Sequence, residues 1–231
     1  AVAKSWNKKI FKHIKAQADQ ASIDLAKEKG ACPDAEEYGI MERFSNKTAV
    51  APTASISIIC GGSSPGIEPI AANVFAHKTL SGTFTVRNRH LKIMLEEKNQ
   101  DNDEVWLSVL SNRGSVQHLE FLSQQEKDVF KTAFEIDQRW LIDLAGDRSE
   151  MIDQAQSLNV FLPADSDKAY LHEVHYSAWK KGVKSLYYCR SLSLQRAENS
   201  SNQPAKIEVK TLDDVAAESN PNDYDECLAC Q

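Results

Sequence analysis

The sequence lacks any apolar run that approaches the roughly 20 residues of a membrane-spanning helix. Its first ten residues contain no apolar stretch of the kind that a secretory signal requires. The chain also has no basic stripe of the kind that nucleic-acid-binding proteins need. We therefore expect a cytoplasmic protein whose partners include neither a membrane nor a nucleic acid.

Cysteine is scarce, and the chain contains only five. An odd, sparse set in a cytosolic-looking chain argues against a framework of structural disulfides. We expect Cys32, Cys60 and Cys189 to be small buried apolar residues. A structural zinc site needs four ligands, and no second closely spaced pair accompanies Cys227 and Cys230. No bound metal is therefore expected.

Acidic residues are concentrated at the C-terminal end of the 231-residue chain, which has a net charge of −6. From Glu198 onward there are eight acidic residues and two lysines, so residues 1–197 are neutral overall. Residues 198–231 lack apolar periodicity, which is typical of a flexible tail. Apolar residues make up 42% of the chain, which is enough for a core, and we assign that core to residues 1–197.

Apolar periodicity predicts a long helix over residues 4–29. The residues of its predicted apolar stripe are Trp6, Ile10, Phe11, Ile14, Ala18, Ala21 and Leu25. Further helices are expected at 88–98, 103–112, 124–134, 137–145, 147–155 and 166–181, and strands at 48–51, 83–86, 157–162 and 183–189. Ser123-Gln-Gln-Glu126 is a capping box for the helix predicted at 124–134. The last strand, helix and strand form a βαβ pattern, which implies parallel pairing. The predicted inner face of the last helix comprises Tyr170, Leu171, Val174, Ala178 and Trp179.

Residues 52–59 are small or apolar and follow a short predicted strand. If a helix begins at Pro52 or Thr53, its free N–H groups would attract an anion such as phosphate. The isoleucines at positions 56, 58 and 59 instead favour a strand. Composition alone leaves both structures open.

Tyr187 and Tyr188 are adjacent in the last predicted strand. Adjacent strand residues point to opposite faces of a sheet, and paired buried tyrosines usually serve packing. A redox or radical role is the alternative, and the residues by themselves favour packing.

The pair Cys227-Leu-Ala-Cys230 lies one residue from the end of the predicted tail. A dithiol on a mobile tail can reach a distant disulfide and exchange with it through a mixed-disulfide intermediate. The alternative is two incidental exposed thiols. We favour thiol exchange, because cytosolic proteins seldom keep such a pair without a use.

Several segments occur in an order that resembles one family. Ala51-Pro-Thr-Ala-Ser-Ile-Ser, followed by Gly66-Ile-Glu-Pro69, resembles the substrate-phosphate segment of the large (alpha) subunit of class I ribonucleoside-diphosphate reductases. Asp153-Gln-Ala-Gln-Ser-Leu-Asn159 and Gly182-Val-Lys-Ser-Leu-Tyr-Tyr188 resemble the last barrel strands of that subunit, and the terminal dithiol resembles its reducing tail. The resemblance implies an α/β fold, namely the C-terminal part of a ten-stranded β/α barrel followed by a flexible tail.

The resemblance also implies an activity and a role for each segment. The family reduces ribonucleoside diphosphates to deoxyribonucleoside diphosphates by radical chemistry, for DNA synthesis. The residues that would bind the substrate phosphates, mainly through backbone N–H groups at a helix start, are Pro52, Thr53, Ala54, Ser55 and Ile56. Tyr187 and Tyr188 would be a stacked pair that relays a radical from the small subunit to the active-site cysteine. Cys227 and Cys230 would re-reduce the active-site disulfide, and thioredoxin or glutaredoxin would then reduce the tail.

The three cysteines outside the tail lack the Asn-x-Cys-x-Glu surroundings of the family's radical cysteine. That cysteine, the substrate-reducing cysteines and the regions that bind ATP and deoxynucleotide effectors would lie upstream of this chain. We therefore expect activity only with the N-terminal part of the large subunit and with the metal-containing small (beta) subunit that supplies the radical. We expect no cofactor on this segment itself. The chain is either a fragment or the product of a split gene.

Two other functions fit the residues. One is a non-catalytic α/β assembly module whose C-terminal tail is a redox-regulated tether, in which the tyrosines would be packing residues. The other is a free-standing thiol oxidoreductase that uses the terminal dithiol. We disfavour the second, because such motifs usually lie at a helix N-terminus, which lowers the thiol pKa.

Overall fold

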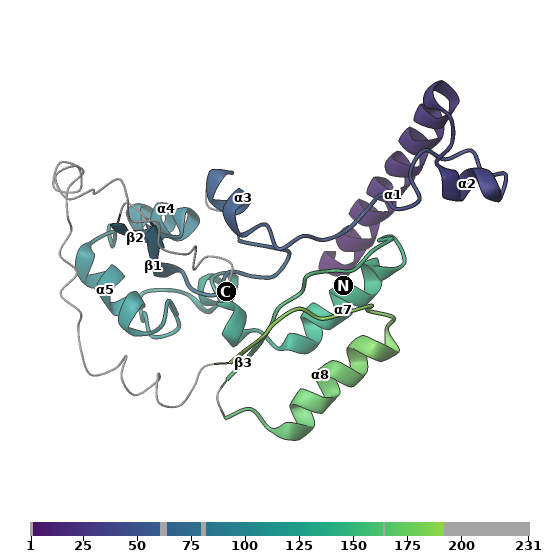
Figure 1. The fold of residues 1–231 in the computed structure, drawn as a ribbon. Coiled ribbons are helices and arrows are strands. Elements are labelled where there is room, and N and C mark those ends of the chain that lie inside the picture. Colours follow the sequence, from purple (N-terminus) through teal and green to yellow (C-terminus); the bar gives the residue numbers. More distant parts are fainter. Residues whose placement is uncertain (1, 61–63, 80–81, 164, 192–231) are drawn as a thin grey trace, which may run out of the picture. The chain divides into compact units, whose positions relative to one another are not determined.

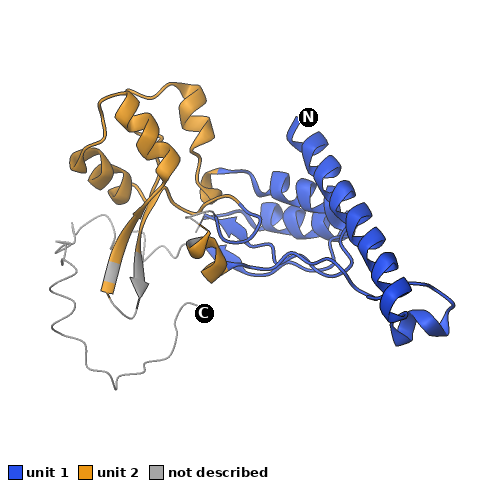
Figure 2. Cartoon of the chain, turned by 90° about the horizontal axis from the view of Figure 1, so that it is seen from above, with its two compact units in different colours: residues 1–53, 64–68, 136–191 blue, residues 54–63, 69–135, 192–231 orange. Residues whose placement is uncertain are grey.

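The computed structural model describes residues 2–60, 64–79, 82–163 and 165–191. They form two compact units, each with its own hydrophobic core (Figure 2). Unit 1 contains residues 1–53, 64–68 and 136–191, and unit 2 contains residues 54–63 and 69–135. The predicted tail from residue 198, with Cys227 and Cys230, lies outside the described residues, and so does its predicted boundary.

Unit 1 combines helices with a small parallel sheet (Figure 1). Its helices are α1 (Val2–Lys29), α2 (Pro33–Glu37), α7 (Gln138–Ser149) and α8 (Lys168–Lys180). Its strands are β3 (Val160–Leu162) and β4 (Cys189–Ser191), which pair in parallel as the βαβ pattern predicts. The buried core residues, drawn mainly from α7, β3 and α8, are Ile142, Ala145, Leu158, Val160, Leu162, Val174, Ala178 and Val183.

Short polar residues fix where the helices of unit 1 begin. The carboxylate of Asp137 accepts a hydrogen bond from the Arg139 N–H at 3.0 Å, and α7 follows. Asp167 does the same for the Ala169 N–H at 3.2 Å, and α8 follows. Each carboxylate satisfies one of the N–H groups that a helix leaves free in its first turn. The two helices that cover the sheet therefore have defined starting points.

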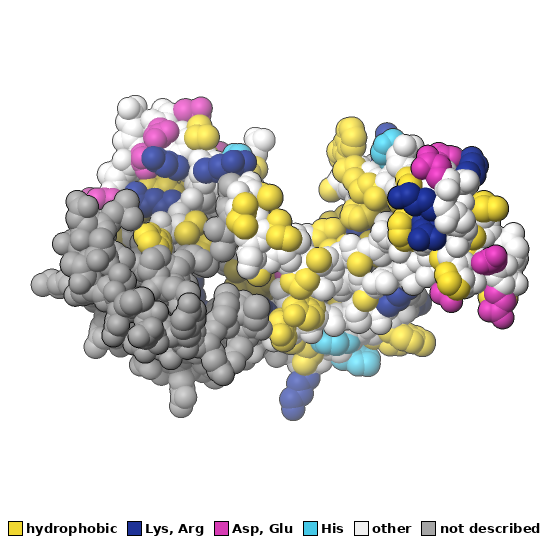
Figure 3. Space-filling model, turned by 45° about the horizontal axis from the view of Figure 1, so that its top comes forward, with side chains coloured by type: hydrophobic (Ala, Val, Ile, Leu, Met, Phe, Trp, Pro, Cys, Tyr) yellow, Lys and Arg dark blue, Asp and Glu magenta, His cyan; other side chains and the backbone are white. Residues whose placement is uncertain are grey.

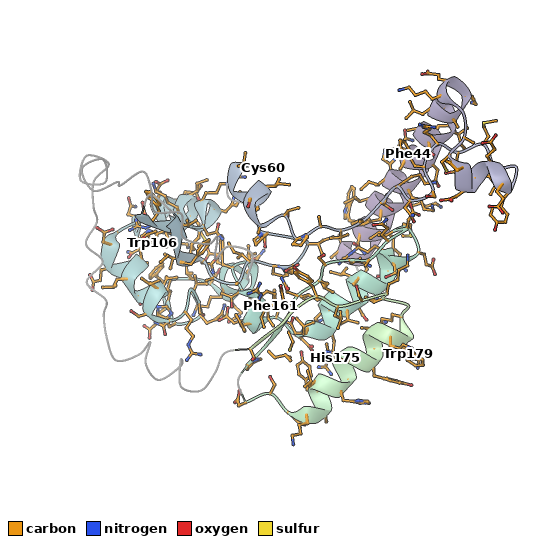
Figure 4. The ribbon with its side chains drawn as sticks, in the orientation of Figure 1. Phe44, Cys60, Trp106, Phe161, His175 and Trp179 are labelled. Carbon is orange, nitrogen blue, oxygen red and sulfur yellow. The ribbon has the colours of Figure 1, made fainter. Side chains whose placement is uncertain are left out.

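Unit 2 is built around one antiparallel hairpin and short helices. Its elements are α3 (Ala54–Ile59), β1 (Val74–Thr79), β2 (Gly82–Arg87), α4 (Arg89–Glu97), α5 (Asp103–Ser111), α6 (Gln124–Val129) and the 3-10 helix η1 (Ala133–Glu135). The buried core residues are Val74, Leu91, Leu95, Trp106, Val109, Val116, Leu119 and Leu122, and Figure 4 labels Trp106. Asn88, Asn102 and Ser123 cap α4, α5 and α6 through their side-chain oxygens.

Helix α1 begins two residues before its predicted start and ends at the predicted residue, but it does not bury the whole of the predicted apolar stripe. Trp6 is 60% exposed, and Ile10 and Ile14 are also exposed, while Ser22 and Ala26 are buried. The helix contacts α7 along a neighbouring face, through ion pairs and a side-chain hydrogen bond. Apolar side chains of α1 therefore remain at the surface. Figure 3 shows hydrophobic side chains, in yellow, at the surface of other described parts of the chain as well.

The predicted inner face of α8 is only partly correct. Val174 and Ala178 are buried and Tyr170 is half-buried, but Leu171 is exposed and Trp179 is 72% exposed (Figure 4). The sheet and α7 cover only a narrow stripe of this helix, so residues at the edges of the apolar arc face outward. The prediction was wrong at these two edge positions.

Several predicted boundaries also differ. The two helices predicted over 137–155 are one helix, α7, and strand β1 was not predicted. The strand predicted at 48–51 is reduced to a single parallel bridge between Val50 and Gln156. The strand predicted at 183–189 becomes regular only at Cys189. Among the described helices, none is both long and apolar enough to cross a membrane.

Candidate functional site

The predicted phosphate segment forms a helix start. Pro52 and Thr53 lie in unit 1, and α3 begins at Ala54 in unit 2. The hydroxyl of Ser57 donates a hydrogen bond to the Ala54 carbonyl at 2.9 Å, within the first turn. The helix therefore prevails over the strand that the isoleucines favour, and Ile56 and Ile59 are exposed. Ala54, Ser55 and Ile56 occupy the turn whose N–H groups an α-helix leaves without internal partners.

Thr53 has an unusual backbone conformation, with a φ of 50°. A β-branched residue is strained in this region, and such strain is often found at functional sites. The Thr53 hydroxyl oxygen accepts a hydrogen bond from the Gly66 N–H at 2.9 Å. Gly66 has a φ of 71°, and a Cβ there would lie 2.8 Å from the Glu68 carboxylate. The turn at 64–68 therefore holds Thr53 and requires a glycine.

Glu68 is a buried carboxylate that is 6% exposed. One of its oxygens accepts a hydrogen bond from the Ile67 N–H at 3.2 Å, and the other accepts one from the side-chain amide of Asn159. Arg148, only 3% exposed, donates a hydrogen bond to Gln156 at 2.5 Å. Burial lowers the pKa of the Arg148 guanidinium to about 10, while the negative charge of Glu68 acts in the opposite direction. Glu68 and Arg148 thus place opposite charges inside unit 1.

The rings of Tyr187 and Tyr188 lie against one another. Their centroids are 4.1 Å apart and their planes are inclined by 51°. The residues are 46% and 43% exposed, so the pair lies at the surface of unit 1. The Arg190 guanidinium lies 5.1 Å from the Tyr188 ring centroid, and the Tyr188 N–H donates to the Asn159 side-chain oxygen at 3.2 Å. Strand alternation predicted that the two rings point to opposite faces, and this prediction was wrong, whereas the contact between the rings that the resemblance implied is present.

The three cysteines outside the tail are free thiols. Cys32 is half-buried, but Cys60 and Cys189 are exposed, which contradicts the expectation that all three are buried. The reason is local, because Cys60 directly follows the exposed end of α3 and the side chains of β4 face outward. Within the described part of the chain, no group of three or more His, Cys, Asp or Glu side chains could hold a metal ion.

Sequence reasoning gave no role to Glu68, Asn159, Arg148 or Gln156, although the structure buries or half-buries all four. A weak signal was available for two of them. Glu68 follows Ile67 and precedes a proline, and Asn159 stands between Leu158 and Val160. A polar side chain inside an apolar run predicts a buried partner, because an unpaired buried polar group is costly. The identity of the partner cannot be read from such a signal.

Strands β3 and β4 pair in parallel with α8 between them, and Val50 forms a further parallel bridge. Parallel strands joined by helices are the units from which β/α barrels are built. Residues 34–189 match the family model "Ribonucleotide reductase, barrel domain". The chain therefore belongs to the ribonucleotide reductase family and corresponds to a segment of its large subunit. The predicted family and barrel fold are confirmed, whereas the roles of individual residues remain predictions.

Named relatives agree with this assignment. The chain is 43% identical over 211 residues to the "Ribonucleoside-diphosphate reductase large subunit" of Invertebrate iridescent virus 3, covering 90% of this chain and 33% of the relative. It is 45% identical over 204 residues to the protein of the same name from Invertebrate iridescent virus 6, covering 87% of this chain and 21% of the relative. The chain thus spans a third or less of the length of these two relatives.

A solved structure is similar as well. The "Actinobacillus ureae class Id ribonucleotide reductase alpha subunit" superposes with a TM-score of 0.75 at 37% sequence identity. The match covers 85% of this chain and 35% of that one. Both the sequence and the three-dimensional fold therefore place the chain in the same family.

Proposed function

We propose that this chain is part of the alpha subunit of a class I ribonucleoside-diphosphate reductase, which reduces ribonucleoside diphosphates to deoxyribonucleoside diphosphates by radical chemistry for DNA synthesis. The observation that carries the proposal is the paired rings of Tyr187 and Tyr188, 4.1 Å apart, in a chain of this family. The names of the relatives, which are ribonucleoside-diphosphate reductase large subunits, support the class of substrate.

The substrate phosphates would bind at residues 52–56. Two features support this role. The N–H groups of Ala54, Ser55 and Ile56 lie in the first turn of α3, where free donors and the helix dipole favour an anion. Thr53, which precedes them, has the strained backbone that is common at functional sites. Pro52 contributes by having no N–H group of its own to satisfy.

Tyr187 and Tyr188 would relay the radical from the small subunit to the active-site cysteine. Oxidation of a tyrosine removes one electron and one proton from its phenol, and the neighbouring tyrosyl radical accepts an electron and a proton in turn. The short distance between the two rings and their partial exposure suit such a transfer at a surface that meets another subunit. The small (beta) subunit, with its metal centre, would supply the radical.

The terminal dithiol would restore the active site after each turnover. Cys227 and Cys230, which lie outside the described residues, would exchange with the active-site disulfide and become oxidised themselves. Thioredoxin or glutaredoxin would then reduce the pair. The remainder of the large subunit would supply the radical cysteine, the substrate-reducing cysteines and the sites for ATP and deoxynucleotide effectors, since the chain spans only part of its relatives.

The radical role is tested by removing each phenol separately. In the reductase assembled from the large subunit that contains this chain and from its small subunit, we expect Tyr187→Phe and Tyr188→Phe each to reduce deoxyribonucleotide formation to the detection limit. Phenylalanine keeps the contact between the two rings but has no O–H group to oxidise. Equilibrium binding of CDP should not change, because neither ring lies in residues 52–56.

The matched control is Tyr176→Phe on α8, whose ring also lies against neighbouring rings, those of His172 and Trp179. This variant should keep its turnover. Normal turnover in either Tyr187→Phe or Tyr188→Phe would contradict the radical role.

A further inference from the structure

We propose that Asn159 is a positioning residue for the tyrosine pair, and that Glu68 and the turn at 64–68 couple it to the phosphate-binding segment at Thr53. The inference rests on the proposed function and deepens it. Thr53, the turn at 64–68, Asn159 and the two tyrosines all belong to unit 1, so the contacts between them lie within one compact unit. Residues 54–56 of the phosphate segment belong to unit 2.

The pairing between residues 158–160 and residues 187–188 is irregular. The Tyr187 N–H donates to the Leu158 carbonyl at 2.9 Å, and the Val160 N–H donates to the Tyr188 carbonyl at 2.9 Å. In a regular parallel ladder one residue would provide both of these groups. Here two residues, Tyr187 and Tyr188, lie opposite the single residue Asn159, which is the arrangement of a β-bulge.

The bulge explains why the rings meet. Successive side chains alternate between faces in a regular strand, and an extra residue breaks that alternation. The rings of Tyr187 and Tyr188 can then pack at 4.1 Å. Because of the bulge, the Tyr188 N–H makes no ladder hydrogen bond to the Leu158 carbonyl. It donates instead to the side-chain oxygen of Asn159, at 3.2 Å. Asn159 thus fixes the backbone that sets the geometry of the pair.

Glu68 determines the orientation of the Asn159 amide. The amide has one accepting oxygen and one donating NH₂ group, and a carboxylate can only accept. The NH₂ group must therefore face Glu68, and this places the oxygen toward the Tyr188 N–H. In the flipped orientation, the amide oxygen of Asn159 would face the Glu68 carboxylate, and its NH₂ group would face the Tyr188 N–H, so neither hydrogen bond could form. Because Glu68 is buried, this preference is not weakened by water as it would be at the surface.

The turn that carries Glu68 also contacts Thr53. The Gly66 N–H donates to the Thr53 hydroxyl at 2.9 Å, and Ser64 donates to the Glu68 carbonyl at 2.8 Å. A displacement of Thr53 when phosphate binds would therefore move Gly66, and with it the Glu68 carboxylate two residues later. The path from the phosphate segment to Tyr188 consists of hydrogen bonds through Gly66, Glu68 and Asn159.

A reciprocal pair of substitutions tests this path in the assembled reductase. Asn159→Asp keeps the oxygen that accepts from Tyr188 but places a second carboxylate against Glu68. We expect its kcat for CDP reduction to fall about tenfold, with the KM for CDP changed by less than about twofold. In the double variant with Glu68→Gln, the new amide donates to the new carboxylate, and kcat should return to within about threefold of the wild type.

The control for a general loss of stability is Asn73→Asp in unit 2. Asn73 is another buried asparagine, and its amide donates to the carbonyls of Gly114 and Phe130. The kcat of the Asn73→Asp enzyme, measured per folded molecule, should equal that of the wild type. Wild-type kcat in Asn159→Asp, or no recovery in the double variant, would overturn the inference while leaving the proposed function intact. Failure of the proposed function is recognised separately, by normal turnover in Tyr188→Phe.

Hydrogen–deuterium exchange provides a readout that a merely structural role would not change. In the wild-type enzyme, saturating CDP should slow exchange in peptides that cover residues 183–191. In Asn159→Asp, CDP should still bind but should leave this exchange unchanged. Equal slowing in both proteins would show that substrate reaches the tyrosine pair by another route, and the coupling through Asn159 would be refuted.

Discussion

Asp137 connects the start of α7 to α8. Its carboxylate accepts hydrogen bonds from the Arg139 guanidinium at 2.6 Å and from the Tyr170 hydroxyl at 2.9 Å. The hydrogen bonds from Arg139 lower the pKa of Asp137 from 3.8 to about 2, and partial burial acts in the opposite direction. Because the folded-state pKa is below the ordinary value, the carboxylate stabilises the fold above pH ~4, and this contribution is lost as the pH falls toward ~2.

Asp137→Asn removes the charge and keeps an oxygen that can cap the helix. We expect the variant to be less stable than the wild type by about 0.5–1 kcal/mol at pH 6, because the ion pair is partly exposed. The difference should shrink between pH ~4 and ~2, where the wild-type carboxylate takes up its proton. Urea unfolding of both proteins at pH 6, 4 and 3 measures this difference. A difference in unfolding free energy between the two proteins that does not change with pH would contradict a stabilising role of the Asp137 charge.

At the scale of elements, the turn after α5 is tightly constrained by its neighbour. Gly114 has a φ of 78°, and a Cβ there would lie 2.4 Å from the Ala72 Cβ and 2.8 Å from the backbone nitrogen of Asn73. Its carbonyl accepts hydrogen bonds from the backbone N–H of Asn73 at 3.1 Å and from the side chain at 2.9 Å. This glycine thus brings the end of α5 against the start of β1.

Gly114→Ala should therefore destabilise unit 2 by at least about 2 kcal/mol, since backbone strain and a clash with backbone atoms add together. The matched variant is Gly30→Ala, where φ is 84° but nothing lies within 4 Å of the added Cβ. It should cost only about 1 kcal/mol, the strain alone. Thermal melts of the two variants compare these losses directly, and equal losses would refute the steric explanation.

Elements with local start signals could be predicted, and elements without them could not. The capping box at Ser123 predicted the start of α6, and the apolar period of α1 predicted its end and, to within two residues, its start. Strand β1 was missed, because residues 74–79 show no alternation between apolar and polar side chains and are defined by pairing with β2. Likewise, nothing local distinguishes one helix from two at 137–155.

For the whole molecule, the exposed apolar face of α1, formed by Trp6, Ile10 and Ile14, has the strongest consequence. Large exposed apolar surfaces commonly mark contacts with another protein or a missing part of the same one. Since the chain spans a third or less of the two relatives compared above, we propose that the rest of the large subunit covers this face. The isolated chain should then self-associate.

Replacing Trp6, Ile10 and Ile14 together by Ser should make the isolated chain more monodisperse in light scattering. The triple variant should also bind the remainder of the large subunit at least about tenfold more weakly, because the apolar area is lost from that contact. Lys12→Ser, on the exposed surface of the same helix, is the control and should change neither property. A wild-type chain that is monomeric and melts cooperatively alone would contradict the proposal.

The sequence by itself determined the family, most helices, the parallel βαβ unit and the helix start at the phosphate segment once the resemblance was taken into account. The resemblance also implied that the rings of Tyr187 and Tyr188 meet. Only the tertiary structure decided which faces of α1 and α8 are buried, that a bulge brings the two rings together, and that Glu68 contacts Asn159. The physical reason is that periodicity and capping depend on neighbours along the chain. A bulge or a buried polar pair instead depends on the register between segments that are far apart in sequence, and no local pattern encodes that register.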